Sequence, residues 1–190
     1  RKRELARLSN RLERHPLPEA LWYVPMLRAS LAIEECDWSA ADQHRAEFAR
    51  VGEALRDLNF GHAQAGFAMA SAFHNDVCSE LIPFASAVDD EFPDFSVFRG
   101  AWALMLAESG RHSDSRECYL PLLEELLGAP EDNLWLLTSA LVGECVATIG
   151  DIENASPLLE SMSPFDGEQP VAGYGVLSWG SVSRVLGRLA

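Results

Sequence analysis

The sequence lacks the features that would place it in a membrane or in a disulfide-bonded scaffold. Its 190 residues contain no apolar run near the roughly 18 residues that a membrane-spanning helix needs. The four cysteines lie far apart, form no Cys-x-x-Cys pair, and fall in or beside segments with helical periodicity. We therefore expect buried free thiols rather than disulfides, and a cytoplasmic protein.

Catalytic and metal-binding motifs are missing as well. The chain has no GxxxxGK[ST] phosphate loop, no His-Glu-x-x-His pair and no Gly-x-Ser-x-Gly elbow. His74 and Cys78 have the spacing of two ligands on one helix, but a predicted corner at 75–76 separates them. The acidic run at 89–94 matches neither an EF-hand loop nor a spaced carboxylate pair, and we interpret it as a solvated helix end. We expect no catalytic residue, metal or cofactor in this segment.

Positive charge is scarce, with 15 Lys and Arg against 29 Asp and Glu and a formal net charge of −14. Six of the basic residues lie within residues 1–14. The acidic remainder would repel phosphate backbones and anionic lipids, so we expect no contact with nucleic acid or membranes. We interpret the basic start as a solvated helix or the end of an upstream helix, rather than a DNA-binding arm.

What the sequence does contain is helical periodicity, arranged in pairs. In the pair at 95–127, Phe98, Trp102 and Met105 recur at spacings of three and four, and Leu122 and Leu126 do the same in the second half. A helix pair of this kind cannot cover its own apolar surface, so it needs similar neighbours. Further helices are predicted at 2–14, 18–36, 41–58, 62–74, 78–92, 134–149, 152–162 and 176–190, with a loop at 163–175.

Two finer expectations concern the ends of these helices. We expect Asn59-Phe60-Gly61 to break the chain between two helices, because it interrupts the apolar pattern. In the last helix Gly180, Ser183 and Gly187 share one face, where small side chains would allow a neighbouring helix to approach closely.

The predicted corners recur at regular intervals. They fall near Cys36, Asp76, Gly110 and Gly150, at intervals of 40, 34 and 40 residues, with a small residue five positions after three of them (Ala41, Ser115 and Ala155). Helix–turn–helix units with such a period are typical of tetratricopeptide-like solenoids. We predict one all-α domain over 1–190: a basic lead-in helix at 1–15, then four to five antiparallel helix pairs over 18–190, stacked as a tetratricopeptide-like α-α superhelix. An irregular all-α bundle is the alternative.

The C-terminal half resembles a known family. The stretches that carry the resemblance are ALMLAESGRHSDSRECYLPLL, NLWLLTSALVGECVATIGDIENASPLLESMSPF and VAGYGVLSWGSVSRVLGRLA. They resemble the tetratricopeptide-like arms of large bacterial signalling ATPases, which carry a LuxR-type DNA-binding domain or an adenylate/guanylate cyclase domain. The chain departs from that pattern at Asp76, where the corner lacks Gly, and at Ser115, where Ala is usual. The resemblance implies that the arm continues beyond Ala190.

The resemblance implies recognition without catalysis, in a bacterial signal-transduction or transcription-regulatory protein. Successive first helices would bind a protein, a peptide or a small effector, and would contact other domains of the same polypeptide. The candidate partner-binding residues are Trp135, Tyr174, Trp179 and Arg184, although aromatic residues of a solenoid also serve as core. The alternatives are a structural spacer or a self-association arm that forms a homodimer, and an all-α enzyme with an unrecognised site.

Overall fold

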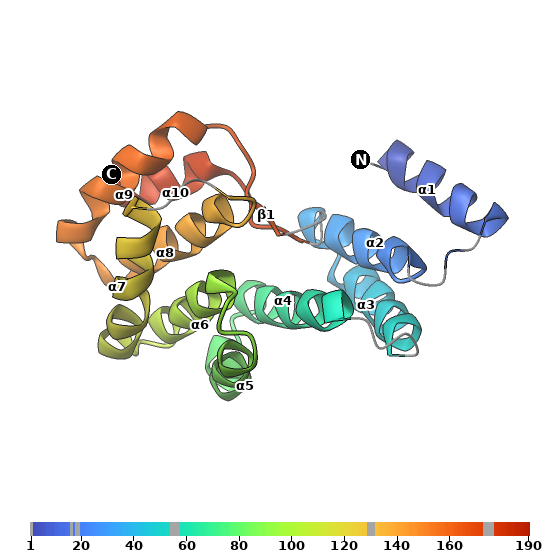
Figure 1. Ribbon diagram of the computed structural model, residues 1–190, viewed down its shortest axis with the longest axis horizontal. Coiled ribbons are helices and arrows are strands. Elements are labelled where there is room, and N and C mark those ends of the chain that lie inside the picture. Colours follow the sequence, from blue (N-terminus) through green and yellow to red (C-terminus); the bar gives the residue numbers. More distant parts are fainter. Residues whose placement is uncertain (1, 16, 18–19, 54–57, 129–131, 173–176) are drawn as a thin grey trace. The chain divides into compact units, whose positions relative to one another are not determined.

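A computed structural model describes residues 2–15, 17, 20–53, 58–128, 132–172 and 177–190. Over these residues the chain forms ten α-helices and two strands of two residues each, which confirms the all-α prediction (Figure 1). None of these helices combines the length and the apolar character needed to cross a membrane. The chain divides into two compact units, which we describe separately.

The first unit comprises residues 1–64 and 174–178, as far as they are described. It contains α1 (Lys2–Arg14), α2 (Tyr23–Glu34), α3 (Trp38–Gly52), the start of α4 (Leu58–His74) and β2 (Leu177–Ser178). Its core is aromatic: the Trp22 ring lies 5.8 Å from Phe48 and 6.3 Å from Phe60, centroid to centroid. The Phe60 ring also fills the space where a Cβ on Gly52 would sit. Burial of Phe60 therefore requires glycine at the end of α3.

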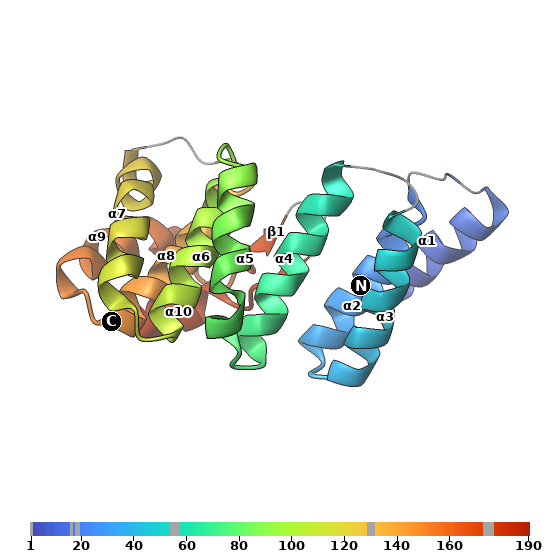
Figure 2. The same cartoon turned by 90° about the horizontal axis from the view of Figure 1, so that it is seen from below.

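The second unit comprises residues 65–173 and 179–190. It contains the rest of α4, then α5 (Cys78–Glu91), α6 (Ser96–Glu108), α7 (His112–Gly128), α8 (Trp135–Ile149), α9 (Ile152–Met162), the 3₁₀ turn η2 (Ser163–Phe165), β1 (Val171–Ala172) and α10 (Val182–Leu189). Helix α6 packs on α5, α7 and α8, and α8 packs on α6, α7, α9 and α10 (Figures 1 and 2). Every residue from Leu137 to Val146 is buried, so α8 is the central helix of this unit.

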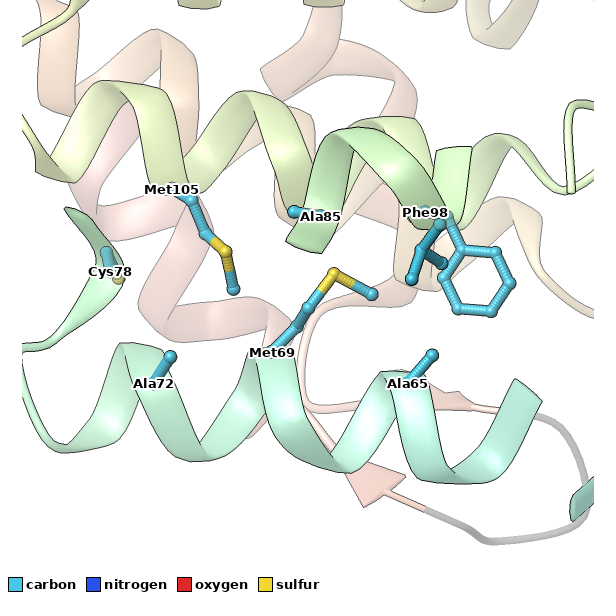
Figure 3. Packing of buried hydrophobic residues seen from close by; sticks show 8 residues of the cluster. Ala65, Met69, Ala72, Cys78, Ala85, Phe98 and Met105 are labelled. Carbon is cyan, nitrogen blue, oxygen red and sulfur yellow. The ribbon is translucent and has the colours of Figure 1, made fainter. Parts of the chain in front are cut away.

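Small residues on α4 allow close packing against α5 and α6. Figure 3 shows Ala65, Met69 and Ala72 of α4 on one side of this core. On the other side are Cys78 and Ala85 of α5 and Phe98 and Met105 of α6. The Ala-rich sequence of α4 thus faces the longer side chains of α6.

All four predicted corners are present, and they share one backbone conformation. Their φ angles lie in the left-handed region: 57° at Cys36, 58° at Asp76, 76° at Gly110 and 76° at Gly150. After each corner the next N–H donates to the carbonyl five residues earlier, as from Arg111 to Leu106 at 2.9 Å. This bond closes the end of a helix and satisfies one of its last carbonyls. The same corner therefore forms with Cys, Asp or Gly at its centre.

Several helix boundaries differ from the sequence prediction, including the start of α2, which lies at Tyr23 although it is predicted at 18. Asn59-Phe60-Gly61 lies inside α4 rather than between helices, because burial of Phe60 outweighs the roughly 1 kcal/mol helix cost of Gly61. The helix predicted to reach 58 ends at Gly52. The last helix begins at Val182 instead of Val176, since Gly180 adopts φ 93° and the Ser181 hydroxyl caps the helix by accepting from the Ser183 N–H at 3.2 Å.

The small residue that brings the last helix close to its neighbour is also a different one. Ser183 and Gly187 are exposed, and nothing lies near a Cβ built on Gly187. A Cβ on Gly143 of α8 would lie only 2.6 Å from Val185 Cγ1 of α10. The expected face of small residues on the last helix was therefore wrong, and the close approach depends on α8.

Backbone conformation predicts opposite effects for two Gly→Ala substitutions, one in a left-handed corner and one inside a helix. At Gly110 we expect a loss of about 1–2 kcal/mol in the free energy of unfolding, because a Cβ is costly at positive φ. At Gly66, in the interior of α4, we expect a gain of up to about 1 kcal/mol, because alanine favours the helix. A Cβ meets nothing within 4 Å at either position, so the backbone alone decides the sign. Urea unfolding checks both, and a neutral Gly110→Ala would contradict the corner.

Candidate functional site

A buried carboxylate on α8 is the centre of the candidate site. Glu144 is the one charged residue in the helix WLLTSALVGECVATI, and it is 0% exposed. A buried carboxylate must be paired, since removal from water is costly for a charge. Two arginines one turn apart on α10 provide the pairing. Arg184 Nη1 lies 2.6 Å from Glu144 Oε1, and Arg188 Nη1 bonds to Oε2.

Further hydrogen bonds fix both guanidinium groups, which we call the arginine pair. Arg184 Nη2 donates to the Trp179 carbonyl at 3.2 Å, and Arg188 Nη2 donates to Thr148 Oγ1 at 2.9 Å. Thr148 Oγ1 in turn donates to Glu108 Oε1 at 2.9 Å. The network therefore links α6, α8 and α10. The arginine side chains stay 43% and 37% exposed, so each joins the buried carboxylate to solvent.

Aromatic packing positions the backbone that holds Arg184. The Trp179 ring is buried, with its centroid 4.9 Å from Phe73 and 6.0 Å from His74. Burial lowers the pKa of His74, and the positive charge of Arg184 lowers it further. His74 is therefore neutral at pH 7 and adds no charge beside the arginine pair.

The structure brings together two of the four predicted partner-binding residues. Trp179 and Arg184 are in direct contact, as described above. Trp135 is the first residue of α8, where its Nε1–H donates to the Leu126 carbonyl at 3.0 Å and its ring packs on Phe165. Tyr174 lies outside the described residues. Both described tryptophans are buried against the chain itself, and a role in binding stays a prediction for all four.

We did not predict Glu144, Thr148 or Arg188 from the sequence. Two patterns would have identified the ionic part of the site. A single acidic residue within an otherwise uncharged, apolar helix indicates a buried carboxylate that needs a cation. Two arginines spaced i, i+4 lie on one face of a helix, where they can share that carboxylate.

A second ionic cluster joins α7 to the corner before α9. Asp151 Oδ2 accepts from the Tyr119 hydroxyl at 2.5 Å, from Arg116 Nε at 2.9 Å and from Asn154 Nδ2 at 2.9 Å. Burial by itself would raise the pKa of Asp151, but these donors lower it to about 2. Burial of the Tyr119 phenol and its bond to Asp151 raise the pKa of Tyr119. The cluster is a structural clamp, with the carboxylate ionised and the phenol neutral.

Two expectations about surface residues need correction. Asp89 belongs to the acidic run that we interpreted as solvated, yet it is buried and its Oδ2 lies 3.1 Å from Arg99 Nε. All four cysteines are free, as expected, but Cys36 is exposed and Cys118 only half-buried. Asp89 can be buried because Arg99 of α6, the helix that packs on α5, pairs with its carboxylate.

A cavity of about 360 Å³ lies in the first unit, between α1 and the α2–α3 hairpin. Its charged groups are already engaged, because Lys2 Nζ lies 2.5 Å from Glu35 Oε1 and Arg28 Nη2 donates to Ser9 Oγ at 3.2 Å. Among the described residues no group of His, Cys, Asp and Glu could hold a metal ion. We therefore take the arginine pair, and not this cavity, as the candidate site.

The fold and the site together define an all-α chain of repeated helix pairs with a buried ionic cluster. No protein-family model, no curated protein and no solved structure matches this chain.

The Glu144 network predicts that Arg188→Ala lowers the free energy of unfolding by about 2 kcal/mol, because it leaves a buried carboxylate half-paired. Arg111→Ala is the matched control: its partner Asp114 is 48% exposed, so we expect about 0.5 kcal/mol or less. Chemical denaturation measures both. Equal effects would show that Glu144 does not depend on its arginines.

Asp151 predicts a pH-dependent contribution to stability. Its folded pKa, about 2, is below the ordinary 3.8, so its contribution is complete above about pH 4 and disappears as the pH falls toward 2. We expect Asp151→Asn to cost about 1–2 kcal/mol at pH 7, with the gap to wild type narrowing below pH 4. Asp114→Asn, at an exposed pair, should show little loss at any pH. A gap that does not change with pH would refute the assignment.

Proposed function

We propose that this chain is a non-catalytic helical-repeat interaction module with a tetratricopeptide-like superhelical arrangement, which binds a protein or peptide segment. The observation that carries the proposal is the repeated corner: the same left-handed conformation and the same closing hydrogen bond recur at Cys36, Asp76, Gly110 and Gly150. Repetition of one supersecondary unit is typical of solenoids, whose extended surfaces serve recognition.

The packing within the second unit supports this proposal. Helix α6 contacts its own partner α7, the preceding α5 and the following α8. Helix α8 repeats that set with its partner α9, the preceding α7 and the following α10. In a solenoid each helix pair packs only on the neighbouring pairs. The first helices of two successive pairs, α6 and α8, follow this pattern.

The resemblance of the C-terminal half supplies the wider context of the proposal. We place the module in a multidomain bacterial signal-transduction or transcription-regulatory protein, such as one with a LuxR-type domain, in the cytoplasm. The partner is a protein or peptide, or a small effector, and other domains of the same polypeptide respond to binding. The net charge of −14 argues against contact of this segment with nucleic acid.

One observation favours the alternative of a spacer or self-association arm. Helix α8 is buried along its whole central part, and the segment after α9 covers it: Phe165 packs on Trp135, and β1 contacts α8. Part of the face formed by the first helices is therefore occupied by the chain itself.

A peptide-binding assay with a parallel mass measurement separates the two functions. We expect an array of fluorescent peptides of varied charge to include a class that binds with micromolar affinity, while light scattering shows a monomer in its presence. Circular dichroism confirms that the chain is folded during the assay. A folded chain that binds no peptide class would refute the interaction module, and a stable dimer with no peptide binding would establish the self-association arm.

A further inference from the structure

The arginine pair is a preorganised cationic group. Each guanidinium has five N–H donors in a fixed planar fork. Within the described residues, Arg184 uses its two Nη atoms on Glu144 and the Trp179 carbonyl, and Arg188 uses its own on Glu144 and Thr148. The two side chains stay 43% and 37% exposed, and each fork has more N–H donors than these bonds use. Because these bonds already fix the side chains, little rotamer freedom is left to lose on binding.

In direct contact, the cluster sets two positive charges against one negative charge. Two arginines contact one carboxylate, and the neighbouring His74 is neutral at pH 7 because burial and Arg184 lower its pKa. Two further acids lie one hydroxyl away: Glu108 meets Arg188 through Thr148, and Asp166 accepts from the Ser183 hydroxyl beside Arg184. Among the ion pairs of the described residues, Glu144 is the carboxylate that two arginines share.

The Asp151 cluster shows the opposite balance and provides a comparison. Arg116 is also exposed to a similar extent, 44%, and also contacts a nearly buried carboxylate. It faces a second acid as well, since Glu153 Oε2 lies 3.7 Å from its Nη2. The excess there is one negative charge, so an incoming anion would be repelled.

We propose that the arginine pair is an anchor for a carboxylate of an acidic peptide segment, with Arg184 and Arg188 as its specific contacts. This proposal rests on the proposed interaction function and adds the chemistry of the partner. Guanidinium forks match the two oxygens of a carboxylate and form charge-assisted hydrogen bonds with it. One carboxylate of a peptide fits this site better than a nucleic acid, because a phosphate backbone needs a series of cationic contacts and the arginine pair offers two.

The test compares two short fluorescein-labelled peptides, one of alternating Glu and Ala and one with Gln in place of each Glu. Fluorescence anisotropy at low and high salt reports binding, and the side-chain Nε–H signals of arginine in an NMR spectrum report the site. We expect the Glu peptide to bind, to weaken as salt rises, and to shift the signals of Arg184 and Arg188. The Gln peptide should bind at least about tenfold more weakly.

Conservative variants keep the protein folded during this test. Arg184→Lys and Arg188→Lys retain the charge that neutralises Glu144 but lose the fork, so each should weaken the Glu peptide about tenfold. Arg116→Lys makes the same change at the comparison cluster and should leave affinity within about twofold. A thermal melt checks that all three variants are folded.

The outcomes separate this proposal from the broader one. Binding of the Glu peptide that Arg184→Lys and Arg188→Lys leave unchanged would overturn the anchor while the interaction module stands. Binding of other peptides in the array without binding of the Glu peptide would do the same. Failure of every peptide to bind the folded chain would refute both proposals.

Discussion

The fully buried carboxylate of Glu144 is the constraint on which the end of the chain depends. Such a charge inside an apolar helix is tolerated only where cations reach it, and the cations come from α10. This fixes the position and rotation of α10 against α8, with Gly143 allowing the close approach of Val185. The bond from Arg184 to the Trp179 carbonyl extends the constraint to the segment before α10. Helix packing and ion pairing at this point are therefore one interaction.

The helical corners show how a repeated structure is maintained without a repeated sequence. At Gly110 and Gly150 the left-handed conformation has no steric cost, whereas Cys36 and Asp76 adopt it at some cost in local energy. The closing hydrogen bonds and the burial of the flanking helices offset that cost. Ser115 makes a similar point, because its hydroxyl donates to the Ala103 carbonyl at 2.7 Å and so satisfies a polar group at a fully buried position.

The two ionic clusters balance their charges differently, and for this reason we assign stability to one and propose recognition for the other. The Asp151 cluster brings three donors to Oδ2 of its carboxylate and has a further acid beside it, so it stabilises the corner before α9. The Glu144 cluster uses one carboxylate for two arginines, so part of its positive charge faces solvent. The difference arises from one additional residue in each cluster. In the Asp151 cluster it is an acid, Glu153, and in the Glu144 cluster it is a second arginine.

The sequence by itself determined the helix pairs and their corners, because apolar spacing and corner residues are local features that neighbouring residues express directly. It also indicated Arg184, but it predicted neither the role of Glu144 nor the start of α10. The role of Glu144 depended on contacts between residues 40 or more positions apart, as between Glu144 and Arg188, and the start of α10 on the left-handed Gly180 and the Ser181 cap. Phe60 is a similar case, since its burial against Trp22 extended a helix through a glycine that local propensity disfavours. Only the tertiary structure decided these features, because a buried charge or ring is stabilised by whichever distant group the fold places beside it.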